Sequence, residues 1–240
     1  MTTSITIDRR FNGPVASGNG GYSAGLAARL IEGAAEVTLR APVPLDELLS
    51  LVDTPSGIDV LDGETLVMSV KPATLQAPLM RPPSLAAAVR ATHSYPSVED
   101  HVLPTCFVCG PSRPDGLRLF TGLVEQADNP NAQPIVASPW IPAADLADES
   151  GRIALEYIWA AIDCPGAFAL GVEPILLGRI SAAIIERPRP GDQLIVVAWA
   201  RGSDRRKHFA GVGLYSEAGA LLAHAEQTWI QIDQHAHLKG

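Results

Sequence analysis

The sequence has few cysteines, no long apolar run and no excess of basic residues. Its three cysteines are an odd number in 240 residues, which argues against a secreted disulfide framework. Apolar stretches are interrupted within about ten residues, whereas a membrane-spanning helix needs roughly 20. The opening MTTSITIDRR lacks the charged-then-apolar layout of a signal peptide. These absences predict a cytoplasmic protein that does not act at a membrane.

The charge balance argues against nucleic acid as a partner. The chain carries 18 Lys and Arg against 26 Asp and Glu, for a net charge of −8. Binding nucleic acid requires basic residues that replace condensed counterions, and no basic run covers a face. A small phosphate-bearing ligand needs only a few local cations and stays compatible with this balance.

The first half of the chain reads as strand, helix and strand meander. Residues 4–10 alternate weakly, like a strand, and a small-residue helix with an apolar stripe begins near Gly20 and stops at Gly33. From residue 36 the period changes to two, and turn signals at 55–57 and 62–63 separate antiparallel hairpins. This order is typical of an α+β fold.

The second half repeats this order without repeating the sequence. After a proline- and alanine-rich linker, with one short helix at 84–92, a strand is expected at 116–124 and a long apolar helix from near Ile153 to residue 170. Strands follow near 176–186, 192–200, 206–215 and 220–232. We expect a first module at residues 1–80, a linker at 81–104 and a second module at 105–240. Each module should be an antiparallel sheet wrapped around a long central helix, with the two joined edge to edge.

Two short motifs resemble a known family. CFVCGPSRPDGL at 106–117 is similar to the CFxCG…PxGL run that precedes the first strand of many single-domain hotdog thioesterases. SGNGGY at 17–22 resembles the glycine pair that opens the hotdog central helix, usually preceded by histidine. With the duplicated order, the chain resembles the acyl-CoA thioesterase branch of the double-hotdog, thioesterase-like superfamily. That resemblance implies a tandem hotdog fold and an acyl thioester as the small-molecule ligand, without a cofactor.

Thioester hydrolysis needs donors for the carbonyl oxyanion, and a helix N-terminus supplies unpaired N–H groups. Gly20 and Gly21 fit that role because glycine lets a carbonyl approach closely, and Asn19 stands where the family usually has histidine. The alternative is that Asn19 only caps the helix and the glycines only form a turn.

Asp163 is the candidate catalytic carboxylate. It lies in an otherwise apolar helix, where a carboxylate is costly unless it is paired or functional. Pro165 cannot donate to the carbonyl of Ala161, so the helix should kink there. Alternatively, Asp163 accepts hydrogen bonds where the helix ends.

The two helices have diverged in a complementary way. The first helix keeps the glycines but has Ala28 and Arg29 where its carboxylate would be, and the second keeps Asp163 but begins Ala154-Leu155-Glu156. In the related dimers each site combines one module's helix N-terminus with the other module's carboxylate. We therefore expect one complete composite site, Asn19/Gly20/Gly21 with Asp163, and one inactive site.

Gln227 and Ser181 are further candidates for the catalytic site. Gln227 lies on an otherwise apolar strand face, and the related thioesterases use a glutamine on a similar strand, with a hydroxyl residue, to hold water. The threonine of those enzymes is matched by Gly178, which departs from the pattern, and Ser181 is the nearby substitute. A core glutamine bonded to backbone is the alternative.

Two further clusters, one basic and one of cysteines, resemble ligand sites but also have simpler structural explanations. Arg205, Arg206 and Lys207 surround a hairpin turn and can grip coenzyme A phosphates, although such turns are more often only solvated. Cys106 and Cys109 form one CxxC pair, but no second pair follows, so we expect no metal site.

The leading hypothesis is an acyl-thioester hydrolase, with acyl-CoA as the expected substrate. A non-catalytic acyl or acyl-CoA binding protein on the same fold is the alternative. A hydratase or dehydratase is disfavoured because no histidine lies near either helix start. Exposed sheet edges are compatible with a homodimer.

Overall fold

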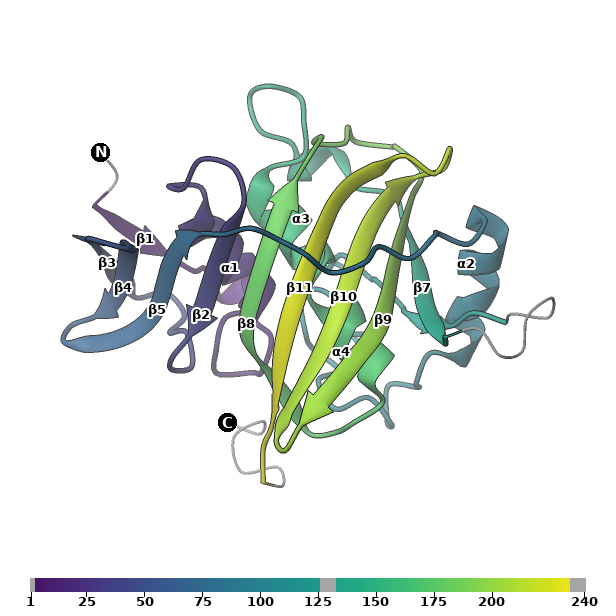
Figure 1. Ribbon diagram of the computed structural model, residues 1–240, viewed down its shortest axis with the longest axis horizontal. Coiled ribbons are helices and arrows are strands. Elements are labelled where there is room, and N and C mark those ends of the chain that lie inside the picture. The colour runs from purple at the N-terminus through teal and green to yellow at the C-terminus, as the bar shows by residue number, and fades with distance from the viewer. Residues whose placement is uncertain (1–2, 126–132, 234–240) are drawn as a thin grey trace.

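One continuous antiparallel sheet of 11 strands forms the body of the protein. The computed structural model describes residues 3–125 and 133–233. In the sheet the strands follow the order β1-β3-β4-β5-β2-β8-β11-β10-β9-β7-β6 (Figure 1). Their bounds are β1 Ser4–Thr6, β2 Ala35–Leu39, β3 Leu48–Thr54, β4 Gly57–Asp62, β5 Thr65–Pro72, β6 Gly122–Leu123, β7 Ile135–Trp140, β8 Ile175–Ile184, β9 Leu194–Asp204, β10 Lys207–Ser216 and β11 Leu221–Gln231.

The two sheets expected, one for each module, are joined edge to edge into one continuous sheet. Strands β1 to β5 come from the first half of the chain and β6 to β11 from the second, but β2 pairs directly with β8. In this pairing Ala35 lies opposite Ala182 and Thr38 lies opposite Arg179. Edge pairing satisfies N–H and C=O groups that each half would otherwise leave open, so the two halves share one sheet.

Three of the four helices of the described residues lie on one face of this sheet, behind it in Figure 1, whereas the helix at 85–91 packs on the other face against Ala137, Ile195 and Val197. α1 spans Gly20–Ala28, α2 spans Leu85–Ala91, α3 spans Leu155–Ala161 and α4 spans Cys164–Leu170. Short 3-10 turns occupy Arg9–Phe11, Thr92–Ser94 and Ala144–Leu146. The first helix is shorter than expected, since it ends at Ala28 rather than at Gly33.

The second central helix is broken, not continuous. α3 ends at Ala161, α4 begins at Cys164, and Asp163 lies between them with φ −92° and ψ −81°. Pro165 lacks an N–H and so cannot continue the α3 hydrogen-bond ladder, which is the physical reason for the break. The break turns the backbone at Asp163 and frees carbonyl groups that need other partners.

Helices α1 and α3 cross very closely. A Cβ at Gly25 would lie 2.6 Å from Cα of Glu156 and 2.8 Å from Cβ of Trp159, so a larger residue would force the helices apart. Buried side chains from both halves of the chain, including Ile7, Met68, Phe107, Ile158 and Leu214, join in one apolar cluster. This shared core fixes the start of α1 against the α3–α4 break.

The segment after β5 crosses the other face of the sheet, in front of β8 to β10 in Figure 1. The backbone N–H groups of Gln76 and Ala77 donate to Glu226 Oε1, and Tyr215 Oη donates to the Met80 carbonyl.

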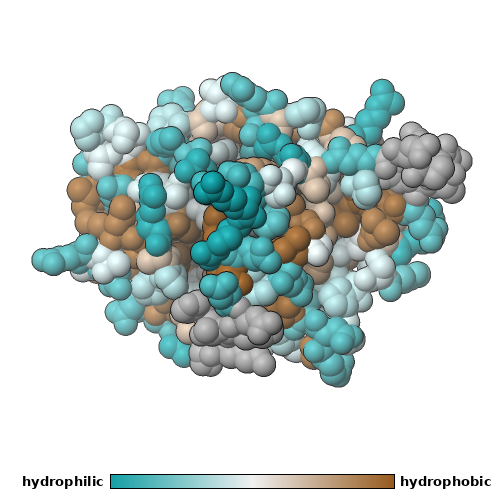
Figure 2. Space-filling view, turned by 60° about the horizontal axis from the view of Figure 1, so that its bottom comes forward, coloured by the Kyte–Doolittle hydropathy of each residue, from teal (hydrophilic) through white to brown (hydrophobic). Residues whose placement is uncertain are grey.

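The molecular face in Figure 2 mixes hydrophobic residues (brown) with hydrophilic ones (teal). Within the described residues, no helix combines the length and apolar character that a membrane crossing requires.

The strand expected at 116–124 is reduced to the two residues of β6. Arg118 has a φ of +56°, which interrupts an extended run, and the amide of Leu117 donates to the Phe107 carbonyl instead of to a strand. The four late strands lie within two residues of the expected starts and, apart from the β9 end at Asp204, of the expected ends.

Candidate functional site

The start of α1 is built by an asparagine cap and two glycines. Asn19 Oδ1 accepts from the Tyr22 amide at 2.9 Å, so Asn19 caps the helix as the alternative interpretation supposed. The Asn19 side chain also has an amide nitrogen, Nδ2, that is not needed for the cap. This group points toward the other half of the chain.

Asp163 meets this helix start directly. Its Oδ2 accepts from the Gly21 amide at 2.9 Å and from Asn19 Nδ2 at 3.0 Å. The residue is 2% exposed, and its second oxygen, Oδ1, has no hydrogen-bond partner within the described residues. The structure thus brings Asn19, Gly20, Gly21 and Asp163 together across the two halves of the chain.

Glycine is required at position 21 because of this contact. A Cβ there would lie 2.4 Å from Cβ of Asp163 and 2.7 Å from the Trp159 carbonyl oxygen. Gly20 differs from it, because its N–H makes no hydrogen bond within the described residues and the residue lines a cavity. The Gly21 N–H therefore orients the carboxylate, while the Gly20 N–H is free for a ligand.

Burial raises the pKa of the Asp163 carboxyl to about 7. The hydrogen bond from the Gly21 amide and that from Asn19 oppose this rise, while the neighbouring Cys106 adds to it. A carboxyl group with such a pKa is partly ionised at neutral pH and can both accept and return a proton.

Gln227 supports the break in the second helix. Its Nε2 donates to the carbonyls of Ile162 at 2.6 Å and Asp163 at 2.9 Å, and its Oε1 accepts from Trp229 Nε1 at 2.7 Å. These are carbonyls at the α3–α4 break. Gln227 is bonded to backbone, as the alternative interpretation held, but that backbone is the one that carries Asp163.

Ser181 lies away from this cluster. Its partner across the β8–β11 pair is Glu226, which is the residue before Gln227, and directly opposed residues share a face of the sheet. Ser181 Oγ also contacts Glu36 Oε2 at 3.3 Å. Ser181 and Gln227 therefore point to opposite faces, and Ser181 cannot hold a water beside Asp163.

Gly178 is an extra residue in β8 rather than a counterpart of a side chain in the site. The pairing with β11 passes from Thr228↔Arg179 to Trp229↔Leu177, so Gly178 forms a bulge. The bulge turns Leu177 inward, where its side chain lies against Gly20.

A cavity of about 290 Å³ borders the cluster. Its lining combines polar groups with apolar side chains from β2, β8, β11 and the neighbouring loops. Its lining includes Asn19, Gly20, Leu39, Asp163, Leu177 and Ile230. A carboxylate in a largely apolar lining suits a ligand with one reactive polar group on an apolar body.

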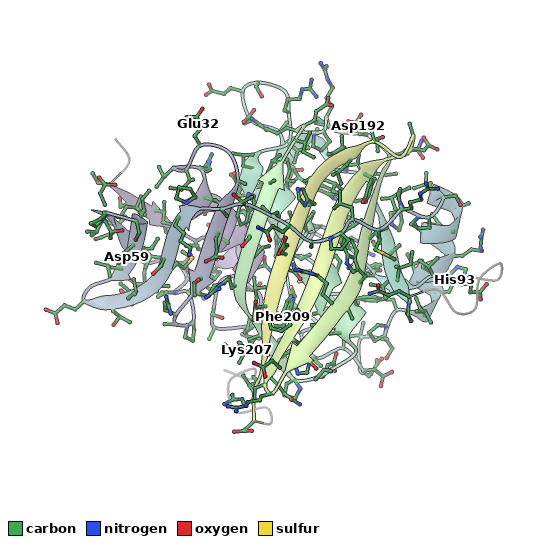
Figure 3. All side chains as sticks on the ribbon, viewed as in Figure 1. Glu32, Asp59, His93, Asp192, Lys207 and Phe209 are labelled. Atoms are coloured by element: carbon green, nitrogen blue, oxygen red, sulfur yellow. The ribbon has the colours of Figure 1, made fainter. Side chains whose placement is uncertain are left out.

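The basic hairpin lies at the same end of the sheet as this cavity. Arg205 and Arg206 form the β9–β10 turn, and Lys207 pairs with Ile230, which lines the cavity. Figure 3 shows Lys207 at the lower end of the sheet, opposite to Asp192. The three side chains are exposed, and Arg206 Nε donates to the Gln231 carbonyl at 2.9 Å.

The corresponding position at the start of α3 has no equivalent arrangement. Ala154 gives α3 no side-chain cap, and the buried Glu156 lies 3.6 Å from Arg29 at the end of α1. An ion pair fills the space where the second helix start meets the first helix. The two helix starts thus differ in their surroundings.

A group of three thiols that the sequence pattern did not predict lies beside Asp163. Cys164, 55 residues beyond Cys109 in the chain, brings its sulfur to the CxxC pair, and all three sulfurs lie within 4.8 Å of one another. A hydrogen bond from the Cys109 thiol, followed by one from Cys164, holds the pKa of Cys106 well below its usual value. The position of Cys164 directly after Asp163 was the available signal.

No family model and no curated protein matches this sequence. Solved structures do match it along most of its length. A hot dog fold protein of unknown function from Alicyclobacillus acidocaldarius is 14% identical, with a TM-score of 0.59 over 97% of this chain and 93% of that one. A tesB protein of Mycobacterium avium subsp. paratuberculosis is 16% identical, with a TM-score of 0.56 over 90% and 87%.

A third match is a candidate thioesterase II from Thermobifida fusca, 12% identical, with a TM-score of 0.59 over 96% of this chain and 92% of that one. At these identities the likeness shows the fold. The chain has a hotdog fold, in agreement with the resemblance of its motifs.

Proposed function

We propose that this protein is an acyl-thioester hydrolase, with acyl-CoA as the substrate class and one composite site between the two halves of the chain. The observation that carries the proposal is the contact of Asp163 with the start of α1, at 2.9 Å from the Gly21 amide. Catalytic groups work within hydrogen-bond reach or through one water, and this distance meets that condition.

Asp163 is the base that activates water. Its Oδ2 is held by Gly21 and Asn19, which leaves the buried Oδ1 as the atom that accepts a proton. The resulting hydroxide adds to the thioester carbonyl carbon. When the tetrahedral intermediate collapses, the carbon–sulfur bond breaks and the thiolate takes the proton back from Asp163. A carboxylic acid and a free thiol are the products. Direct attack by the carboxylate, with hydrolysis of the anhydride, is the second route open to the same atom.

The Gly20 N–H is the donor for the carbonyl oxygen. It lies at the N-terminus of α1, where the partial positive charge of the helix is concentrated, and it is not used within the described residues. The apolar part of the cavity holds the acyl or pantetheine chain. Arg205, Arg206 and Lys207 lie at the same end of the sheet and are the proposed contacts for the phosphates of coenzyme A.

Gln227 is a positioning residue in this proposal. It anchors the carbonyls of Ile162 and Asp163, and so fixes the backbone from which the catalytic carboxylate projects. We also propose that the chain is divided into the two expected modules, residues 1–80 and 105–240. Residues 1–2 and 234–240, at the ends of these modules, lie outside the described residues. A cytoplasmic location and a homodimer stay predictions.

A non-catalytic acyl-CoA binding protein is the second candidate. It is favoured by one specific observation: Ser181 faces away and Gly178 has no side chain, so neither supplies the hydroxyl group that the resemblance implies beside Gln227. A binder would use the same cavity and basic hairpin without turnover.

The test is thiol release from a panel of short, medium, long and aromatic acyl-CoA esters, with the melting temperature measured on the same panel. Turnover of one or more esters well above the uncatalysed rate supports hydrolysis. If no ester is turned over but one raises the melting temperature, the binding function is correct. If the panel gives neither turnover nor a shift, both proposals are wrong.

A further inference from the structure

The three cysteines of the chain converge on one buried point. Cys106 and Cys109 come from the turns before β6, and Cys164 is the first residue of α4. All three are free and buried, and their sulfur atoms lie within 4.8 Å of one another. The sulfurs of Cys106 and Cys164 are 3.8 Å apart.

This spacing suits a thiolate-bound metal ion. In a tetrahedral zinc site with Zn–S bonds of about 2.3 Å, neighbouring sulfurs are about 3.8 Å apart. The Cys106–Cys164 pair already has that separation, and the third sulfur needs to move by at most about 1 Å to match it. A cluster of three thiols within this distance is more than one disulfide requires.

The backbone around Cys106 and Cys109 is built as a tight turn. The Gly110 amide donates to the Cys106 carbonyl at 2.8 Å, and a Cβ at Gly110 would lie 2.5 Å from that oxygen. Only glycine fits, so the turn keeps both sulfurs on one side of the chain. Two cysteines separated by two residues on such a turn have the usual spacing of a zinc ligand pair.

The Asn19 side chain also approaches two of the sulfurs. Its Nδ2 lies 3.9 Å from the Cys106 sulfur and 3.7 Å from the Cys164 sulfur, in addition to its bond to Asp163. An N–H group directed at metal-binding sulfurs is a typical outer contact of such sites, because it stabilises negative charge on the ligand.

Two of the three thiols border the cavity. Cys106 and Cys164 line the cavity together with Asp163, whose Oδ1 is buried and unpartnered within the described residues. A zinc site with three protein ligands and an open position can take water or an incoming oxygen atom as its fourth ligand.

We propose that Cys106, Cys109 and Cys164 bind one thiophilic metal ion of the Zn²⁺ type, with the fourth position open to the cavity beside Asp163. The expectation of no metal site counted only the CxxC pair, because Cys164 is distant in sequence. The proposal does not depend on hydrolysis, since the ligand set is complete without a substrate.

The test uses the full chain, reduced and stripped of metal with a chelator, then titrated with Zn²⁺ and separately with Co²⁺. We expect one ion per chain, Zn²⁺ binding tighter than about 1 μM, and thiolate-to-cobalt charge-transfer absorption. Cys109→Ser and Cys164→Ser should each lose this absorption, whereas Asp62→Asn, an exposed control at the end of β4, should keep it.

Native mass spectrometry of the reduced wild-type chain decides the matter even if the cysteine variants do not fold. One added zinc mass supports the site. Less than about a tenth of an equivalent of bound ion under saturating Zn²⁺, or a mass lower by two hydrogens after mild reoxidation with no metal uptake by the reduced form, overturns it and assigns the cluster to a disulfide. Thiol release from acyl-CoA is measured separately, so failure of either proposal is recognisable by itself.

Discussion

Replacing Gly21 by alanine tests the contact on which the composite site depends. The new methyl carbon would lie 2.4 Å from Cβ of Asp163 and 2.7 Å from the Trp159 carbonyl oxygen, whereas carbon atoms pack at about 3.5–4.0 Å. The start of α1 must therefore move away from the α3–α4 break by about 1 Å. Neither contact is the far end of a flexible side chain, so the neighbours cannot move aside cheaply.

Gly20→Ala is the matched control for stability. It makes the same chemical change one residue earlier, and its methyl group would meet the flexible side chain of Leu177 at 2.9 Å. Both variants gain up to about 1 kcal/mol from helix propensity. Overpacking at position 21 costs about 1–3 kcal/mol, because the backbone there cannot move aside easily. This cost exceeds the gain from helix propensity.

Urea denaturation should therefore place Gly21→Ala about 1–3 kcal/mol below Gly20→Ala in free energy of unfolding. Because the shift also lengthens the hydrogen bond from residue 21 to Asp163, thiol release by Gly21→Ala should fall at least about tenfold. Equal stability of the two variants would refute the close packing of α1 on the break.

Three further outcomes follow from the site. In the metal-free protein the pKa of Asp163 rises from 3.8 to about 7 on folding, so its stabilising effect is present at low pH and is lost as pH rises through 7. The free energy of unfolding of Asp163→Asn should therefore gain roughly 3 kcal/mol on that of wild type between about pH 5 and pH 8. If the free energies from urea denaturation of the two proteins change in parallel over this pH range, this prediction is wrong. Gln227→Leu leaves two buried carbonyls without their donor and should cost roughly 2–4 kcal/mol in thermal unfolding while lowering kcat; unchanged values would show that the glutamine does not anchor the break. Arg206→Ala with Lys207→Ala should raise KM for acyl-CoA but not for an acyl thioester that lacks phosphates, and an equal change for both substrates would exclude phosphate contacts.

The contact of the α1 start with Asp163, at 2.9 Å from the Gly21 amide, was expected from the residues of the two helices together with the family resemblance. Gly20 and Gly21 are unusual at a helix start, and Asp163 is unusual in an apolar helix next to a proline. Local chemistry of this kind is visible in a sequence. The joining of the two halves edge to edge was also expected, but the sequence did not indicate that β2 and β8 are the strands that pair.

The position of Ser181 could not be predicted from its place in the sequence. Its distance from Gly178 suggested that one residue could replace the other, but a strand face is set by register and by bulges. The bulge at Gly178 changes the alternation of β8, and register then puts Ser181 beside Glu226. Cys164 was missed for a similar reason, because only the folded chain brings it to Cys106 and Cys109.

The most direct test of the central claim is the ratio of kcat/KM between wild type and Asp163→Asn on the best acyl-CoA ester, with Asp62→Asn as an exposed control. The amide keeps the shape of the carboxylate and can accept from Gly21, but it cannot take a proton from water. We predict a loss of at least about 100-fold, with a folded variant and an unchanged control. Activity within a few-fold of wild type would contradict the assignment of Asp163 as the catalytic base.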